Sequence, residues 1–597
     1  MISSLRAWFS QHVALLLVVF VAVALTSVPW FEAWFFSAGA FHWMPLTYAD
    51  EFIYYSHMHE VATGNLFFGN PYFLEHRFDP PLALFGSSVL AALPMLFGLP
   101  LVPTLLLNFV LWGGLFVVLC YWLLREFGAL KWVSALIVLF VYIQSYDLIF
   151  RASVQQEVFP FFLLFYIALI RFLKNKSNIK STLWLGAATG VTFYLYGYLW
   201  QLALATLGFL VLYALVQKDW PLFARSLKAS CLGLLIGAPA FIYTVWITHQ
   251  PYFWESMDRW GLVHTHLPVA EVIYSGGWVG LVLAFLFFIR LKIPQLKTNP
   301  EFFATFLFLC VTGLGLWVTQ GSNLITGQML ELGEHLRVFI VPWLALVTTL
   351  SCWTLWSQRA YMSKKFQIFS GVMLCVLLCA NLVFAYEHLS RFVPSPEQRA
   401  LWAQEQSYAG PLRWLDAHEP SPVVVWGDPH NELTTYVPAL TRQYVLFEQF
   451  GQFNLLSNDE FYERYLVSQY FNNPDAAQLK ADFGLYIGRS KQFHYPKTLE
   501  REVKLCRLLH FYQSDRGSKT CGTVPSPTEL LGDAFFNSLE TKFQKDIKPN
   551  IKTYLKKYHV SYILKDTQLD PQYRPEALGA ARVYTDGKFE IYTLPPL

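Results

Sequence analysis

Charged residues are scarce in this sequence, and their scarcity excludes an ordinary soluble protein. Only 14% of the 597 residues are charged, whereas 55% are hydrophobic and the mean hydropathy is +0.36. Soluble domains carry about 25% charged residues. The 44 basic and 41 acidic residues also lack the positive excess of a nucleic-acid-binding protein. The composition therefore indicates a polytopic membrane protein with no nucleic-acid partner.

The sequence also lacks a cysteine pair at the C-x-x-C spacing of a zinc site. Most of its eight cysteines lie in or beside apolar runs, where thiols act as small hydrophobic residues. Cys506 and Cys521 lie in the polar C-terminal third. The sequence is compatible with either a disulfide or two free thiols at this pair, because sequence spacing does not test disulfide geometry.

Apolar runs long enough to cross a bilayer fill the first two thirds of the chain and predict about eleven transmembrane helices. The first is longer than the apolar part of a signal peptide and lacks an A-x-A cleavage site, so we expect it to be retained. The predicted spans are residues 13–30, 101–124, 132–149, 157–173, 182–197, 198–216, 229–248, 274–290, 301–319, 337–356 and 367–386.

Basic residues predict the orientation of these spans. One set of alternate loops holds sixteen Lys and Arg residues and the other set holds four. Cytoplasmic loops retain positive charge, so the N-terminus is expected in the cytoplasm and the C-terminus outside. The apolar run 81–99 would break this alternation if it crossed the membrane. We therefore predict an interfacial or partly inserted helix there, favoured by its Pro94 and Gly98.

The expected fold class is thus an α-helical polytopic membrane protein with an exported C-terminal α/β domain. We predict a membrane domain over 1–386, with interfacial helices in a first outer loop at 31–100, and a soluble domain over 387–597. Two short apolar runs there, at 422–428 and 558–566, predict buried strands, and the segment after the first predicts a helix.

Acidic residues open the polar part of the first outer loop, where charge beside the bilayer suggests function. Asp50 and Glu51 precede a segment, 51–62, that is compatible with a helix and contains Tyr54. One interpretation is that Asp50 only caps this helix. The other is that the pair is catalytic.

This loop resembles the GT-C class of membrane glycosyltransferases, in particular the branch of protein O-mannosyltransferases and lipid A aminoarabinose transferases. The segment GEHLRVFIVPWLALV also resembles a later helix of that branch. The resembling loop residues are Asp50, Glu51, Tyr54, Gly64, Asn65, Pro80, Pro81 and Leu82.

The resemblance implies a sugar donor linked to polyprenyl phosphate and a base at Asp50, with Glu51 as its neighbour. An acceptor hydroxyl has a pKa far above neutrality, so a carboxylate must take its proton as it attacks. Direct attack inverts the anomeric configuration. The acceptor is expected to be a glycolipid, a cell-envelope glycan or a protein.

Two further acidic residues, Asp147 and Glu157, lie in the second outer loop. The resemblance makes them candidates to hold a divalent cation, Mg²⁺ or Mn²⁺, although no cofactor is required by the sequence. The alternative for Glu157 is a favourable position at a helix N-terminus.

The leaving phosphate calls for cations or hydrogen-bond donors near the outer face. The candidates for donor phosphate and sugar binding are Arg337, Arg259, His264, Tyr54 and His335. The alternative interpretation of Arg337 is a side chain that snorkels to the membrane interface, and that of His264 is a position in a solvated loop.

Two other functions compete with a glycosyltransferase: a non-catalytic membrane scaffold, and a transporter of lipid-linked saccharides. The charges gather in outer loops and no clear repeat is visible, which disfavours a transporter. The C-terminal segment contains no N-x-S/T sequon, which favours a bacterial inner membrane with a periplasmic C-terminal domain.

Overall fold

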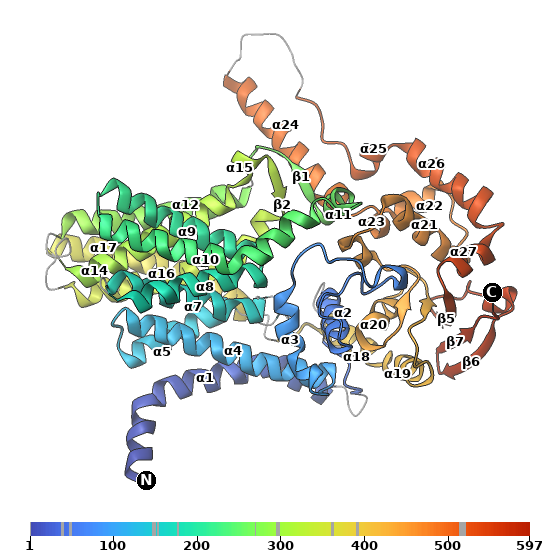
Figure 1. Cartoon of the computed structure of the whole chain (residues 1–597), viewed down its shortest axis with the longest axis horizontal. Helices are drawn as coiled ribbons and strands as arrows, with labels where there is room; N and C mark the ends of the chain where they lie inside the picture. Colours follow the sequence, from blue (N-terminus) through green and yellow to red (C-terminus); the bar gives the residue numbers. More distant parts are fainter. Residues whose placement is uncertain are drawn as a thin grey trace.

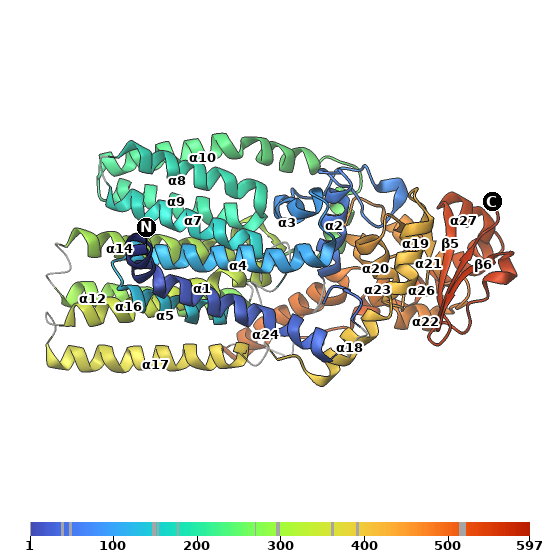
Figure 2. The ribbon, with the colours of Figure 1, turned by 90° about the horizontal axis from the view of Figure 1, so that it is seen from below.

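The computed structural model describes residues 2–36, 41–46, 51–145, 151, 155–175, 178–268, 270–293, 299–359, 363–389, 393–512 and 521–596. Long helices run side by side through the first two thirds, and a mixed α/β domain lies at one end of this bundle (Figure 1; Figure 2). The long helices are α1 (Ile2–Phe36), α4 (Leu101–Glu126), α7 (Gln155–Lys174), α9 (Gly197–Val216), α10 (Trp220–Ile247), α12 (Ala270–Lys292), α14 (Pro300–Gln320), α16 (Leu332–Ser357) and α17 (Lys364–Leu389).

Nine of the eleven predicted spans are helices long and apolar enough to cross a membrane within the described residues. The polytopic helical fold is therefore confirmed. The other two predicted spans are also helices of the bundle but are shorter: α5 (Lys131–Gln144) has 14 residues and α8 (Ile179–Leu195) has 17. At about 1.5 Å per residue, α8 extends for about 25 Å.

Glycines bring α8 and α10 into close contact. A Cβ atom added to Gly190 would lie 2.5 Å from Cβ of Ile236, and one added to Gly186 would lie 2.8 Å from Cβ of Leu232. Small residues at such spacing let membrane helices approach closely. They hold the α8–α9 junction, which contains Tyr196, in place at one end of the bundle.

Two short helices lie in the first loop between the bundle and the C-terminal domain (Figure 2). Helix α2 (Glu51–Ala62) has the bounds that the sequence suggests. Helix α3 (Gly86–Leu96) has only 11 residues, too few to cross a bilayer, and Asn108 of α4 donates a 2.8 Å hydrogen bond to the carbonyl of Ala91.

The C-terminal domain is built on a five-stranded sheet in the order β4-β3-β5-β7-β6. Strand β3 is parallel to β4 and β5, whereas β7 is antiparallel to β5 and β6. Both predicted strands and the predicted helix are present, as β3, β5 and α20. The strands are β3 (Val424–Trp426), β4 (Tyr444–Val445), β5 (Val560–Asp566), β6 (Ala581–Asp586) and β7 (Phe589–Thr593).

The C-terminal domain also contains helices, and Cys506 of α24 is joined to Cys521 by a disulfide. The open question about this pair is thereby answered in favour of the bridge. The helices are α18 (Pro396–Gln406), α19 (Ala409–His418), α20 (Leu433–Leu440), α21 (Asn458–Ser468), α22 (Ala476–Ala481), α23 (Phe483–Tyr486), α24 (Tyr495–Tyr512), α25 (Pro527–Leu531), α26 (Asp533–Lys542) and α27 (Ile551–Lys557).

The first loop is docked on the C-terminal domain. The backbone N–H of Val445 on edge strand β4 donates to the carbonyl of Tyr72 at 2.9 Å. The hydroxyl of Tyr444 donates to the buried carboxylate of Glu60 on α2, also at 2.9 Å. Loop and domain therefore form one continuous layer over the end of the bundle.

Candidate functional site

Helix α2 places Glu51 and Tyr54 on its first turn, at the end of the bundle. Glu51 is only 4% exposed, and the guanidinium of Arg151 lies 5.4 Å from the centre of the Tyr54 ring. Burial raises the pKa of Tyr54 far above its usual range. The negative charges of Glu331 and Glu51 add to this rise, and Arg489 opposes it. Tyr54 therefore keeps its proton and lies among several charged side chains.

A chain of three side chains begins at the start of α16. The carboxylate of Glu331 lies 2.9 Å from Nε2 of His335, one turn along the helix. On the other side of the imidazole, Nδ1 is hydrogen-bonded to the hydroxyl of Tyr196, between α8 and α9. The ring of Tyr198 stacks on the imidazole at 4.7 Å and 7°. The imidazole is therefore fixed in orientation.

The C-terminal domain reaches the same carboxylate. Nε of Arg489 lies 2.8 Å from Oε1 of Glu331, and Nε2 of His494 lies 3.3 Å from that oxygen. Burial alone would raise the pKa of Glu331, but the two histidines and Arg489 outweigh burial and hold this pKa well below its usual range. Glu331 also has φ of +45°, an uncommon backbone conformation outside glycine that clusters at functional sites.

We call this group of side chains the mouth cluster. Its members come from the first loop, the second loop, the α8–α9 junction, the start of α16 and the C-terminal domain. They are Glu51, Tyr54, Arg151, Tyr196, Glu331, His335, Arg489 and His494.

The structure brings three sequence-predicted site residues into the mouth cluster: Glu51, Tyr54 and His335. The predicted site residues did not include Arg151, Tyr196, Glu331, Arg489 and His494. The spacing of Glu331 and His335, four residues apart at a helix start, is the one local signal that points to part of this group.

The other predicted phosphate-binding residues make different contacts. Arg259 is 1% exposed on α11 (Phe253–Trp260) and donates at 2.7 Å both to Asn458 and to the carbonyl of Leu456. Its guanidinium is thus used to hold the C-terminal domain. His264 is exposed on β1 (Leu262–His264), a strand paired with β2 (Gln328–Leu330), and Arg337 is exposed on α16.

Of the predicted acidic residues, Asp50 and Asp147 lie outside the described residues. Glu157 is fully buried at the start of α7, and neither carboxylate oxygen has a hydrogen-bond partner among the residues that the structure describes. Within that same part of the chain, no three His, Cys, Asp or Glu side chains are arranged to hold a metal ion.

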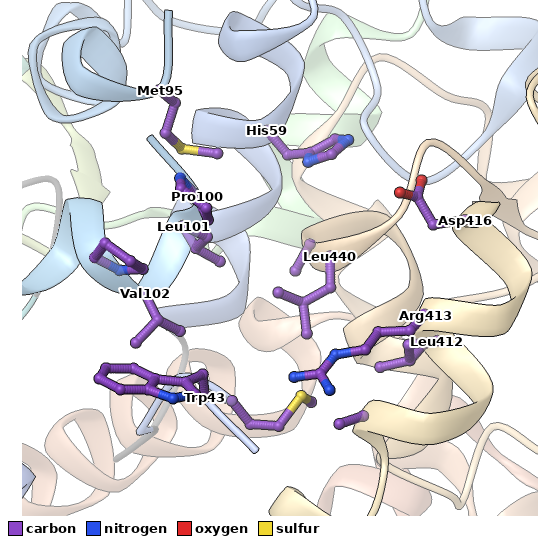
Figure 3. A pocket seen from close by; sticks show the side chains of 14 residues that line it. Trp43, His59, Met95, Pro100, Leu101, Val102, Leu412, Arg413, Asp416 and Leu440 are labelled. Atoms are coloured by element: carbon purple, nitrogen blue, oxygen red, sulfur yellow. The ribbon is translucent and has the colours of Figure 1, made fainter. Parts of the chain in front are cut away.

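A cavity of about 480 Å³ lies against α2 and the start of α4 (Figure 3). Its walls are largely apolar, with Leu101, Val102 and Leu440 among them, and Arg413 and Asp416 come from α19. Burial lowers the pKa of His59 in this wall to about 4, so its imidazole is neutral. The cavity is lined by none of the mouth-cluster residues.

No protein-family model and no curated protein matches the chain. Among solved structures, the chain is similar to the crystal structure of ArnT from Cupriavidus metallidurans bound to undecaprenyl phosphate. That match has 13% sequence identity and a TM-score of 0.37, and it covers 98% of this chain and 99% of the other.

Proposed function

We propose that the chain is a GT-C-type glycosyltransferase that moves a sugar from a polyprenyl-phosphate donor to an acceptor hydroxyl. The observation that supports this proposal is the mouth cluster. It gathers carboxylates, guanidinium groups and tyrosine hydroxyls at the end of a membrane bundle, beneath a polar domain. A lipid-linked substrate presents its phosphate and sugar at that level of a membrane.

The donor phosphate has suitable partners in this proposal. Arg151 and Arg489 each carry a planar guanidinium whose N–H groups match phosphate oxygens. Tyr54 keeps its proton and is a hydrogen-bond donor to phosphate or sugar. Arg337 is exposed near the start of α16 and is retained in the proposal as a further contact for the donor phosphate.

Asp50 is proposed as the base that takes the acceptor proton. It precedes Glu51, whose side chain is buried at the start of α2. One base and a phosphate leaving group suffice for a direct, inverting transfer. Binding of a divalent cation, Mg²⁺ or Mn²⁺, by Glu157 and Asp147 is a separate part of the proposal. Measuring sugar transfer with and without a chelator tests it.

The proposed location is a bacterial inner membrane, with the N-terminus in the cytoplasm and the C-terminal domain in the periplasm. Lipid, glycan and protein hydroxyls all offer the same attacking oxygen, so the acceptor class is left to experiment.

The deciding experiment compares wild type with Asp50→Asn in the same membranes, using labelled sugar on polyprenyl phosphate. We expect the variant to fold normally and to lose transfer, because the change is nearly isosteric but removes the base. Asp459→Asn, at an exposed position on α21, is the matched control and should transfer as wild type does. Full activity in Asp50→Asn contradicts the assigned base. If the wild-type protein transfers sugar from none of the donors, the result favours a non-catalytic membrane scaffold.

A further inference from the structure

Helix α24 leaves the body of the C-terminal domain and runs back towards the bundle (Figure 1; Figure 2). Its far end reaches the level of α15 (Asn323–Thr326) along the long axis of the molecule (Figure 1). Helix α15 is the last part of the candidate membrane span Pro300–Thr326, and Ile325 in it is 82% exposed. The interface of the bilayer is expected where a span ends. The far end of α24 therefore lies at the level of the membrane surface.

One face of α24 combines cations with exposed leucines. Its members are spaced at i, i+4, i+7, i+8 and i+11, the spacing of a single helix face. The side chains of Leu505 and Leu508 are 42% and 55% exposed, and those of Lys497 and Lys504 are also exposed. We call this surface the basic face of α24. It consists of Lys497, Arg501, Lys504, Leu505 and Leu508.

The basic face is turned towards the end of the bundle. Nη1 of Arg501 lies 3.8 Å from Sδ of Met329 on β2, the strand between α15 and α16. Leu505 and Leu508 follow Arg501 on the same face by one and two turns. Beyond the contact with β2, the exposed leucines therefore continue along the side of the helix that faces the membrane.

The neighbouring residues leave the basic face accessible. Glu500 flanks the face and lies 2.5 Å from Lys504, but both side chains are more than half exposed. Such a surface pair is weak, so the lysine can exchange its partner for another anion. Cys506 is two residues from Leu508 and thus on another side of the helix, where its disulfide to Cys521 does not cover the face.

We propose that the basic face of α24 binds the bilayer surface beside the bundle and recognises anionic phospholipids. Leu505 and Leu508 enter the boundary between headgroups and acyl chains, as the apolar side chains of interfacial amphipathic helices do. The lysine and arginine stems lie along this boundary and their charged ends reach the lipid phosphates. Each cation near an anionic surface strengthens the attachment by about fivefold. The inference requires a membrane-embedded bundle and does not depend on the proposed enzymatic activity.

Attachment of α24 also bears on the position of the C-terminal domain. The helix directly follows His494, and Nε2 of His494 lies 3.3 Å from Oε1 of Glu331. The bilayer contact therefore holds the segment of the domain that reaches the mouth cluster.

Hydrogen exchange of the full-length protein in lipid nanodiscs tests the proposal. One set of discs contains phosphatidylcholine, the other contains phosphatidylcholine mixed with phosphatidylglycerol, and neither contains polyprenyl phosphate. We expect the amides of residues 497–508 to exchange about fivefold more slowly or less in the anionic discs. High salt should remove most of this difference, because it screens exposed charges. Discs that each hold one protein molecule exclude a second copy as the cause of protection.

The double variant Lys497→Gln with Lys504→Gln should lose most of the difference between the two kinds of disc. Comparing one variant in two lipids cancels any effect of the substitutions on the helix itself. Lys552→Gln with Lys556→Gln, at exposed positions on α27 at the far end of the domain, is the matched control and should keep the difference (Figure 2). Equal exchange of wild type in both kinds of disc would overturn the recognition of anionic lipid. An unchanged difference in Lys497→Gln with Lys504→Gln would overturn the assignment to the basic face.

Discussion

Arg489 of the C-terminal domain forms a 2.8 Å ion pair with Glu331 at the start of α16. The carboxylate of Glu331 is 5% exposed, so the C-terminal domain supplies a counter-charge to a buried group beside the end of the bundle. The domain is therefore part of the candidate site and not merely attached to the bundle.

Arg489→Gln is expected to lower both transfer and stability. Loss of the guanidinium leaves a buried carboxylate with only its histidine partners, which costs about 1–3 kcal/mol of unfolding free energy. Thermal unfolding in detergent measures this loss. Arg582→Gln breaks an exposed 2.7 Å pair with Glu590 and should cost less than about 1 kcal/mol. Equal losses in both variants would show that Glu331 does not depend on Arg489.

Docking of the first loop should weaken at alkaline pH. His76 of that loop lies 3.0 Å from Glu460 on α21 and 2.7 Å from Asp79. Burial lowers its pKa, but these two carboxylates outweigh burial and the nearby Arg464, and they raise the pKa to about 9. The stabilisation is fully present below the unfolded pKa of about 6.5 and is lost as pH rises through about 9.

We expect the contribution of His76 to the unfolding free energy to fall by about 2 kcal/mol from pH 6.5 to pH 10, after allowance for the partly exposed Asp79. His76→Gln should reduce the alkaline decline by that amount and leave the part that comes from His430, whose pKa the carboxylates of Asp428 and Asp482 raise to about 10, whereas the exposed His249→Gln should retain the full decline. A wild-type stability that does not change over this range would show that the imidazolium contributes nothing to docking.

The membrane helices were predictable because hydrophobicity is a local property of the sequence. Helix α8 ends early because Tyr196 has an extended backbone, with φ of −161° and ψ of 128°, inside a continuous apolar run. In the C-terminal domain, β6 and β7 were not predicted, although Asp586-Gly587 between them is a common hairpin signal.

The candidate site was predictable only in part, because its members come from distant segments. The acidic start of α2 is visible in the sequence as charge beside an apolar run. The pairing of Arg489 with Glu331 depends on how the C-terminal domain docks, and no local pattern encodes that contact. Arg259 shows the opposite problem: a conspicuous loop cation proves to be used in domain packing.

The disulfide between Cys506 and Cys521 is expected to stabilise α24 locally without affecting transfer. A bridge over 15 residues contributes up to about 3 kcal/mol by restricting the unfolded chain. Cys506→Ser should therefore increase hydrogen exchange along α24 and change kcat by less than about twofold. Disulfides persist in oxidising compartments, so thiol labelling of both cysteines in freshly isolated wild type would contradict the periplasmic placement.

Close contact between α8 and α10 should make Gly190 intolerant of larger side chains. The Cβ of any substitute would lie 2.5 Å from Cβ of Ile236, so Gly190→Leu must separate two helices that hold Tyr196 at the end of the bundle. We expect poor yield of folded protein in size-exclusion chromatography and loss of transfer. Gly208→Leu on α9 is the matched control, since its Cβ meets nothing within 4 Å. If both variants fold equally well, the glycine contact is not what fixes α8 on α10.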